Sequence, residues 1–256
     1  MYEDLYSLRN KVAVVTGGSR GIGKATALGL AEAGANVVVV SRDLDSLEAV
    51  AQEIKSIGRE AMAISAHVGK TEQLAGVVAQ ITREMGRIDI LVNNAGTNPA
   101  MCSMLELEER LWDSVMNLNL KGLVFLSQAV ARVMKEGGGG SIINVTSADG
   151  IRHETDGGPY AISKAGVIMA TRVMAQEWAR SGIRVNAVAP GHIHTRLGDS
   201  VFSVRPEYEE QLLARVPLGR IGEPRELVGT MVYLASDASS YTTGATFVVD
   251  GGWLLT

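Results

Sequence analysis

The stretch that decides the fold is residues 12–23, which read V-A-V-V-T-G-G-S-R-G-I-G. Its first five residues are small or β-branched, which is typical of a buried strand. The glycines that follow permit a tight turn, and helical spacing begins at Gly23. A strand, a glycine-rich turn and a helix in this order place unpaired backbone N–H groups at a helix N-terminus, where a phosphate can bind. The stretch therefore predicts a dinucleotide-binding unit.

The rest of the chain repeats this alternation of short apolar runs and longer helical stretches. Strands are expected at residues 12–16, 37–40, 61–64, 88–92, 142–146, 185–188 and 246–249. Helices are expected at residues 23–33, 44–57, 71–85, 106–135, 160–181 and 224–235. Parallel neighbours need a crossover connection, so this order predicts an α/β fold. We expect a Rossmann-type, doubly wound, seven-stranded parallel sheet with helices on both faces, in a single domain over residues 1–256.

The composition narrows the class of protein. The net charge is −4, which argues against a nucleic-acid partner. Cys102 is the only cysteine, so no intramolecular disulfide can form and a reducing compartment is expected. The apolar runs are strand-sized, far short of the roughly 20 residues of a membrane helix, and residues 1–10 lack the pattern of a signal peptide. We therefore expect a cytoplasmic protein without a membrane partner. The four histidines lack the paired spacing of a metal site, so no metal is expected.

Two charged residues after the second expected strand bear on the choice of cofactor. Ser41 and Arg42 stand where an NAD enzyme has an acidic side chain for the ribose 2′-hydroxyl, and a forked guanidinium suits a 2′-phosphate. Arg20 in the glycine turn could approach the same phosphate. Asp43 is the main argument for NAD(H). The sequence favours NADP(H), with NAD(H) as the alternative.

Three residues form a candidate catalytic group. Tyr160 and Lys164 are four residues apart in a helical stretch, so their side chains share one face. A tyrosine pKa near 10 is high for base chemistry, and the lysine together with an oxidised nicotinamide would favour the phenolate. Ser147 follows the fifth expected strand, at the sheet edge where ligands bind in such folds. It can hydrogen-bond a substrate oxygen opposite Tyr160.

The motifs together resemble the short-chain dehydrogenase/reductase family, from about Leu8 to Gly252. The resemblance rests on T-G-x-x-x-G-I-G at residues 16–23, N-N-A-G at 93–96, Y-x-x-x-K at 160–164 and P-G-x-I-x-T at 190–195. It implies hydride transfer between the cofactor and a small alcohol or carbonyl compound, with Ser147, Tyr160, Lys164 and Asn119 as catalytic residues. Asn119 would hold a water in a proton relay. The implied cofactor-binding residues are Gly17, Ser19, Arg20, Gly21, Ile22, Gly23, Ser41, Arg42, His67, Val68, Asn94, Gly96, Tyr160, Lys164, Pro190, Gly191, Ile193 and Thr195.

One position departs from the family pattern. After the third strand the family has an aspartate that contacts the adenine amino group, followed by a small apolar residue. Here the pair is His67-Val68. The histidine can still donate or accept a hydrogen bond at adenine, and Val68 keeps the backbone role.

The substrate stays open between several classes. Residues 148–159 are polar and favour a sugar, polyol or hydroxy acid, whereas the apolar residues of a predicted lid over about residues 192–222 suit an acyl or aryl chain. A 3-oxoacyl-carrier-protein reductase is one alternative: Arg132 matches one carrier-docking arginine, but Ser181 stands where a second is expected. A non-catalytic NADP(H)-sensing regulator is the alternative from another class. The presence of Tyr160 and Lys164 argues against it.

The family resemblance also implies a homotetramer. Family members assemble through two long helices and the last strand, here residues 106–135, 160–181 and 245–256. The apolar ending Trp253-Leu254-Leu255 would be costly to leave in water, at roughly 25 cal/mol per Å². We expect a homotetramer that acts on a small-molecule substrate.

Overall fold

A computed structural model describes residues 2–99, 102–153, 157–195 and 206–256. Its strands form one parallel seven-stranded sheet in the order β3-β2-β1-β4-β5-β6-β7. The strands are β1 (Val12–Thr16), β2 (Asn36–Ser41), β3 (Ala61–Ser65), β4 (Ile90–Asn93), β5 (Gly140–Val145), β6 (Ile183–Pro190) and β7 (Thr246–Val249). The predicted fold class is confirmed, and the expected strand positions differ from these by a few residues at their ends.

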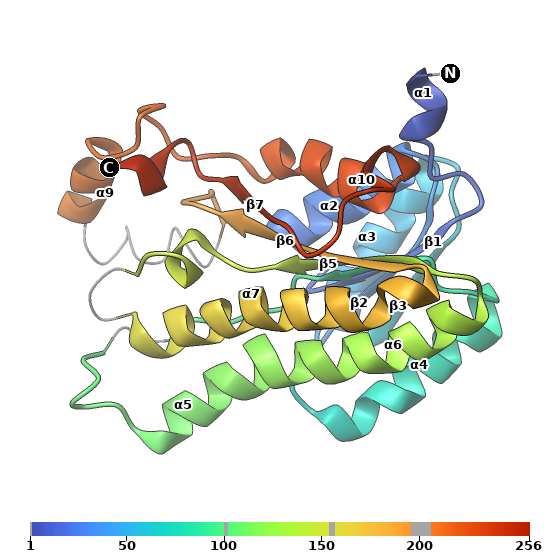
Figure 1. Cartoon of the computed structure of the whole chain (residues 1–256), viewed down its shortest axis with the longest axis horizontal. Helices are drawn as coiled ribbons and strands as arrows, with labels where there is room; N and C mark the ends of the chain where they lie inside the picture. Colours follow the sequence, from blue (N-terminus) through green and yellow to red (C-terminus); the bar gives the residue numbers. More distant parts are fainter. Residues whose placement is uncertain (1, 100–101, 154–156, 196–205) are drawn as a thin grey trace.

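Helices cover both faces of the sheet (Figure 1). One face carries α2 (Gly21–Glu32), α3 (Leu44–Ser56) and α10 (Val228–Ala235). The other carries α4 (Thr71–Met85), α5 (Glu109–Met116), α6 (Leu123–Glu136) and α7 (Gly158–Trp178). Two short helices, α1 (Tyr2–Leu5) and α9 (Pro206–Leu213), lie at opposite ends of the molecule (Figure 1).

Alternate residues of the central strands enter different layers of the core. Val14 and Val38 pack with α4, α6 and α7, while their neighbours Val15 and Val39 pack with α2, α3 and α10. All four side chains are fully buried. A strand that is buried on both sides needs an unbroken apolar run, which explains the sequence pattern of β1 and β2.

The strand order reverses beside β1, which pairs with β2 on one side and with β4 on the other. The loops that follow β1 and β4 leave the carboxyl ends of these strands in opposite directions, so a crevice forms between the two loops. The glycine-rich turn after β1 and the N-N-A-G segment after β4 lie at this point. The topology thus brings two segments together that are about 75 residues apart in sequence.

The helix expected at residues 106–135 begins at Glu109 and runs to Glu136, but its middle is not α-helical. A π-helical turn, Asn117–Gly122, separates α5 from α6. A Cβ atom at Gly122 would lie 2.3 Å from the carbonyl oxygen of Val68, so the helix passes very close to the loop after β3. π turns of this kind are frequent at functional sites, and this one contains Asn119.

The predicted lid is described only at its two ends. Ile193 and Gly222 form an isolated bridge, in which the N–H of His194 donates to the Gly222 carbonyl at 2.8 Å. Residues 196–205 lie outside the described residues, and the lid stays a prediction. In the part of the chain that is described, no helix has the length and apolar character needed to cross a membrane.

Candidate active site

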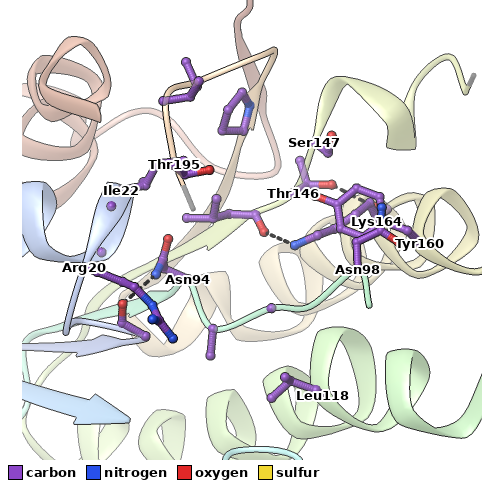
Figure 2. A pocket seen from close by; sticks show the side chains of 18 of the residues that line it. Arg20, Ile22, Asn94, Asn98, Leu118, Thr146, Ser147, Tyr160, Lys164 and Thr195 are labelled. Atoms are coloured by element: carbon purple, nitrogen blue, oxygen red, sulfur yellow. Dashed lines mark hydrogen bonds between the residues drawn. The ribbon is translucent and has the colours of Figure 1, made fainter. Parts of the chain in front are cut away.

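A cavity of about 400 Å³ opens at the carboxyl ends of the central strands (Figure 2). All eighteen predicted cofactor-binding residues line it, from Gly17 in the first turn to Thr195 after β6. Ser147 lines the same cavity, whereas Asn119 does not. One continuous site therefore collects residues from the loops after six strands, β1 to β6, and from α7.

The glycine-rich turn has a shape that larger residues cannot adopt. Gly17 and Gly21 have φ angles of +64° and +53°, in the left-handed region. A Cβ at Gly23 would lie 2.2 Å from the Gly17 carbonyl oxygen. The Asn94 side chain holds the turn from β4 by donating to the carbonyls of Thr16 and Gly17 at 2.9 and 3.2 Å. The result is an open backbone cradle at the start of α2, which fits a pyrophosphate.

The charged residues at the end of β2 have separate tasks. The Asp43 carboxylate caps α3: it accepts from the Ser46 N–H at 3.4 Å and from the Ser46 hydroxyl at 2.6 Å. These bonds, together with the charge of Arg20, lower the pKa of the Asp43 carboxyl. The main sequence argument for NAD(H) is therefore a helix cap. Arg42 and Arg20 are exposed at the cavity edge.

His67 lies in the cavity wall with its ring orientation fixed. Its Nδ1 accepts a hydrogen bond from the Gly69 N–H at 3.1 Å, and its own backbone N–H donates to the Gln73 side chain at 3.0 Å. Because Nδ1 is an acceptor, the ring proton lies on Nε2. Contact with adenine stays a prediction, and the ring can offer a donor there.

Two hydrogen bonds join the end of β5 to α7. Lys164 Nζ donates to the Val145 carbonyl at 2.9 Å, and the Thr146 hydroxyl donates to the Lys164 carbonyl at 2.7 Å. Gly150 permits this approach, because a Cβ there would lie 2.7 Å from the Lys164 carbonyl carbon. These two hydrogen bonds hold Ser147, which follows β5, opposite Tyr160 on α7 (Figure 2).

Two ionisable groups of the site, the buried Lys164 and the half-buried Tyr160, have pKa values that burial shifts. Burial raises the pKa of Tyr160, the negative charge of Asp149 raises it further, and a hydrogen bond with Ser147 partly opposes both. Burial lowers the pKa of Lys164 to about 8. Its Nζ lies 5.6 Å from the centre of the Tyr160 ring. The Ser147 oxygen also accepts from the Asp149 N–H at 3.1 Å, so this serine both caps a turn and faces the tyrosine.

The expected lowering of the Tyr160 pKa does not occur among the protein groups alone. We expected the Lys164 charge and an oxidised nicotinamide to lower this pKa together. Among the protein groups, the largest influence on the Tyr160 pKa is desolvation, which disfavours the phenolate. The phenol is therefore held in its protonated form. This is the form that a proton donor needs.

Asn119 is fully buried and binds protein groups. Its Oδ1 accepts from the Thr97 N–H at 2.8 Å, and its Nδ2 donates to the Thr97 carbonyl at 2.9 Å and to the Ser163 hydroxyl at 3.1 Å. The side chain thus fastens the loop after β4 to α7. Its part in a water relay stays a prediction.

Sequence reasoning missed several residues of the cavity wall, above all Trp253. We expected this residue to be left for an assembly contact, but its side chain is 0 % exposed within its own chain, whereas Leu255 is 86 % exposed. Asn98, Leu118 and His192 also line the cavity. No spacing in the sequence marks these three residues as part of a pocket, and the nearby His194 is exposed.

Comparisons with known proteins agree with this geometry. A family model described as Enoyl-(Acyl carrier protein) reductase matches residues 17–254. The chain is 41 % identical to 2-dehydro-3-deoxy-D-gluconate 5-dehydrogenase of Escherichia coli (strain K12), covering 97 % of each protein. It is also 41 % identical to a 3-oxoacyl-acyl-carrier-protein reductase of Staphylococcus epidermidis, over 95 % of this chain and 98 % of that protein.

A solved structure shows the same likeness in three dimensions. The gluconate 5-dehydrogenase from Burkholderia cenocepacia J2315, in complex with NADP and tartrate, superposes with a TM-score of 0.95. It is 36 % identical, and the match covers 100 % of both chains. The protein is an oxidoreductase that uses a nicotinamide cofactor and a small-molecule substrate. It belongs to the short-chain dehydrogenase/reductase family.

Proposed function

We propose that this protein is an NADP(H)-dependent dehydrogenase that interconverts a hydroxyl and a keto group on a sugar acid. The observation that carries the proposal is the convergence of Ser147, Tyr160 and Lys164 in the cavity that also contains the glycine cradle. A hydride donor and a proton donor can then reach the same carbonyl group.

The residues of the chain divide the chemistry between them. Bound at the cradle, NADP(H) supplies or accepts the hydride. Tyr160 donates a proton to the substrate oxygen during reduction, since a tyrosine phenol carries its proton at neutral pH. The Ser147 hydroxyl hydrogen-bonds the same oxygen and orients it. Lys164 stabilises the phenolate that forms, since most of its ammonium is charged at pH 7 with a pKa of about 8.

Three observations support NADP(H) over NAD(H). Arg42 and Arg20 both line the cavity at the end of β2, where a 2′-phosphate would need cations. Asp43, which could favour a free 2′-hydroxyl, is engaged with Ser46. The similar gluconate 5-dehydrogenase structure contains NADP.

The cavity wall near the catalytic group favours a sugar acid over an acyl chain. Its polar members include Asn98 and His192, which can donate to hydroxyl or carboxylate groups, and Asp149, which can accept from hydroxyl groups. A 3-oxoacyl thioester would need an apolar channel for its chain. Two of the similar proteins are named for sugar acids, 2-dehydro-3-deoxy-D-gluconate and gluconate.

A substrate panel tests the proposal. D-gluconate and 2-dehydro-3-deoxy-D-gluconate are offered with NADP⁺, 5-keto-D-gluconate and acetoacetyl thioesters with NADPH, and each reaction is repeated with NAD(H). We expect the highest kcat/KM with a sugar acid and with NADP(H). A kcat/KM that is at least tenfold higher for the thioester would make the carrier-protein reductase the correct function.

A further inference from the structure

Two residues of the cavity wall, Ser41 and Trp253, each have a buried side-chain polar atom without a partner among the described residues. Five buried side-chain atoms have no hydrogen bond among the described residues, and Trp253 Nε1 is the one nitrogen in that set. An indole N–H can only donate, and it cannot rotate toward another acceptor as a hydroxyl can. Native structures rarely leave such a donor unpaired. Because Trp253 lines the cavity, a group that enters the cavity and displaces the atoms packed around the indole can satisfy it.

The sequence after β7 builds the turn that brings Trp253 to this place. Gly251 and Gly252 have φ angles of +65° and +90°, which favour glycine. The Asp250 carboxylate closes the turn by accepting from the N–H groups of Gly252 and Leu254 at 2.8 and 2.9 Å. The short helix Trp253–Leu255 then lies beside α9, at the end of the molecule where the carboxyl ends of the strands open (Figure 1).

Arg152 holds this short helix against the catalytic loop. Its guanidinium donates to the Trp253 carbonyl at 3.0 Å and to the Thr256 backbone oxygen. The same guanidinium lies 4.6 Å from the centre of the indole ring. Trp253 also belongs to one hydrophobic cluster with Ala148, the residue after Ser147. The position of Trp253 is therefore tied to the loop that carries the catalytic serine.

The charges around the indole favour an anionic acceptor. Arg215 is a second guanidinium near the ring, 5.8 Å from its centre. Two cations close to a buried donor stabilise a negative group bound there more strongly than a neutral one. Asp149 lines the same cavity with the opposite sign and suits hydroxyl donors. A polyhydroxy acid offers both kinds of group.

We propose that Trp253 Nε1 donates a hydrogen bond to the carboxylate of the substrate, and that Arg152 is a positioning residue that holds Trp253 for this contact. The inference deepens the proposed sugar-acid function and rests on it. It assigns substrate specificity to the segment after β7, which the catalytic motifs do not include.

The variant Trp253→Phe tests the contact, since it removes the N–H and keeps an aromatic ring. We expect KM for the sugar acid to rise about tenfold or more, because hydrogen bonds to charged groups are strong. The kcat value and the dissociation constant of NADPH should stay within about threefold. Trp178→Phe is the matched control, since this half-buried tryptophan ends α7 far from Tyr160 and should leave KM unchanged. An unchanged KM in Trp253→Phe would overturn the proposal.

Arg152→Lys tests the positioning role, since it keeps the charge but cannot keep both backbone contacts and the ring contact. We expect the same pattern, a higher KM with nearly unchanged kcat and NADPH affinity, at temperatures well below unfolding. A fall in kcat and in NADPH affinity together, with KM unchanged, would show that Arg152 has a merely structural role and would overturn its assignment as a positioning residue.

An NMR titration gives a readout without turnover. The chain has three tryptophans, so ¹⁵N-tryptophan labelling gives three indole N–H signals, and Trp253→Phe identifies one of them. D-gluconate added to the complex with NADPH should shift the Trp253 signal and leave the other two in place. D-glucitol, which lacks the carboxylate, should shift it less; equal shifts would overturn the carboxylate assignment.

The substrate panel separates failure of the proposed function from failure of this inference. If only thioesters are turned over, the sugar-acid function fails, and the KM of Trp253→Phe for the thioester then tests the role of Trp253 separately.

Discussion

Lys164 is a buried cation, and its burial should be measurable as a pH-dependent cost in stability. Its side chain lies almost entirely inside the protein, and burial lowers its pKa from 10.5 to about 8. Because the folded pKa lies below the unfolded one, the unfolded state binds more protons between these two values. The free energy of unfolding must therefore rise with pH in this range.

The size of the effect follows from the shift. Each pKa unit corresponds to about 1.36 kcal/mol, so ionised Lys164 costs about 3 kcal/mol near pH 7. Between pH 7 and pH 9.5 the native lysine loses its proton while the unfolded one keeps most of its charge. Integration over this interval gives a gain of about 2 kcal/mol for the native protein. The Val145 hydrogen bond contributes a separate, nearly constant amount.

The variant Lys164→Met isolates the ionisation. Free energies of unfolding are measured for both proteins by urea titration with circular dichroism, at one protein concentration, from pH 7 to pH 9.5. Across this range, the free energy of unfolding of the native protein should rise by about 2 kcal/mol relative to that of the variant. Lys55→Met, at an exposed lysine of α3, is the control and should run parallel to the native protein. Parallel curves for Lys164→Met would refute the reasoning.

Three further outcomes are expected. Gly23→Ala should weaken NADPH binding more than tenfold in a fluorescence titration, because its Cβ would lie 2.2 Å from the Gly17 oxygen; Gly76→Ala in α4, with no atom within 4 Å of the new Cβ, should not. Arg42→Ala should raise KM for NADPH about tenfold while leaving KM for NADH nearly unchanged, and equal effects on both would contradict NADP(H) selectivity. Light scattering should give four times the chain mass of 27.1 kDa, since α7 leaves apolar residues such as Met169, 56 % exposed, for an assembly contact; a monomer mass would exclude the homotetramer.

Much of the fold could be predicted because its signals are local. The runs of β1 and β2 are continuous and apolar, and the glycine turn between β1 and α2 has a spacing that few other structures need. The boundaries were less certain where a tertiary contact decides them. The π-helical turn between α5 and α6 ends where Gly122 approaches Val68, and a helical pattern in the sequence does not contain that contact.

The residues of the site also divide into those with a local sequence signal and those that only tertiary contacts place. Ser147, Tyr160 and Lys164 follow from spacing and from the ends of elements. Trp253 could not be assigned in this way, since an apolar residue near the end of a chain is as consistent with an interface as with a pocket wall. Only the turn at Asp250 and the bonds from Arg152 place it. The pKa of Tyr160 likewise depends on burial, which is a property of the folded chain.

The most direct test of the account is single-turnover hydride transfer in Tyr160→Phe, followed by NADPH absorbance in a stopped-flow instrument with saturating keto acid. The variant should bind NADPH within about tenfold of the native protein, or about 1.4 kcal/mol. Its hydride transfer should be slower by about 10²–10⁴-fold, because the proton donor to the substrate oxygen is gone. Transfer at a rate within a few-fold of the native one would contradict the assignment of Tyr160 as that donor.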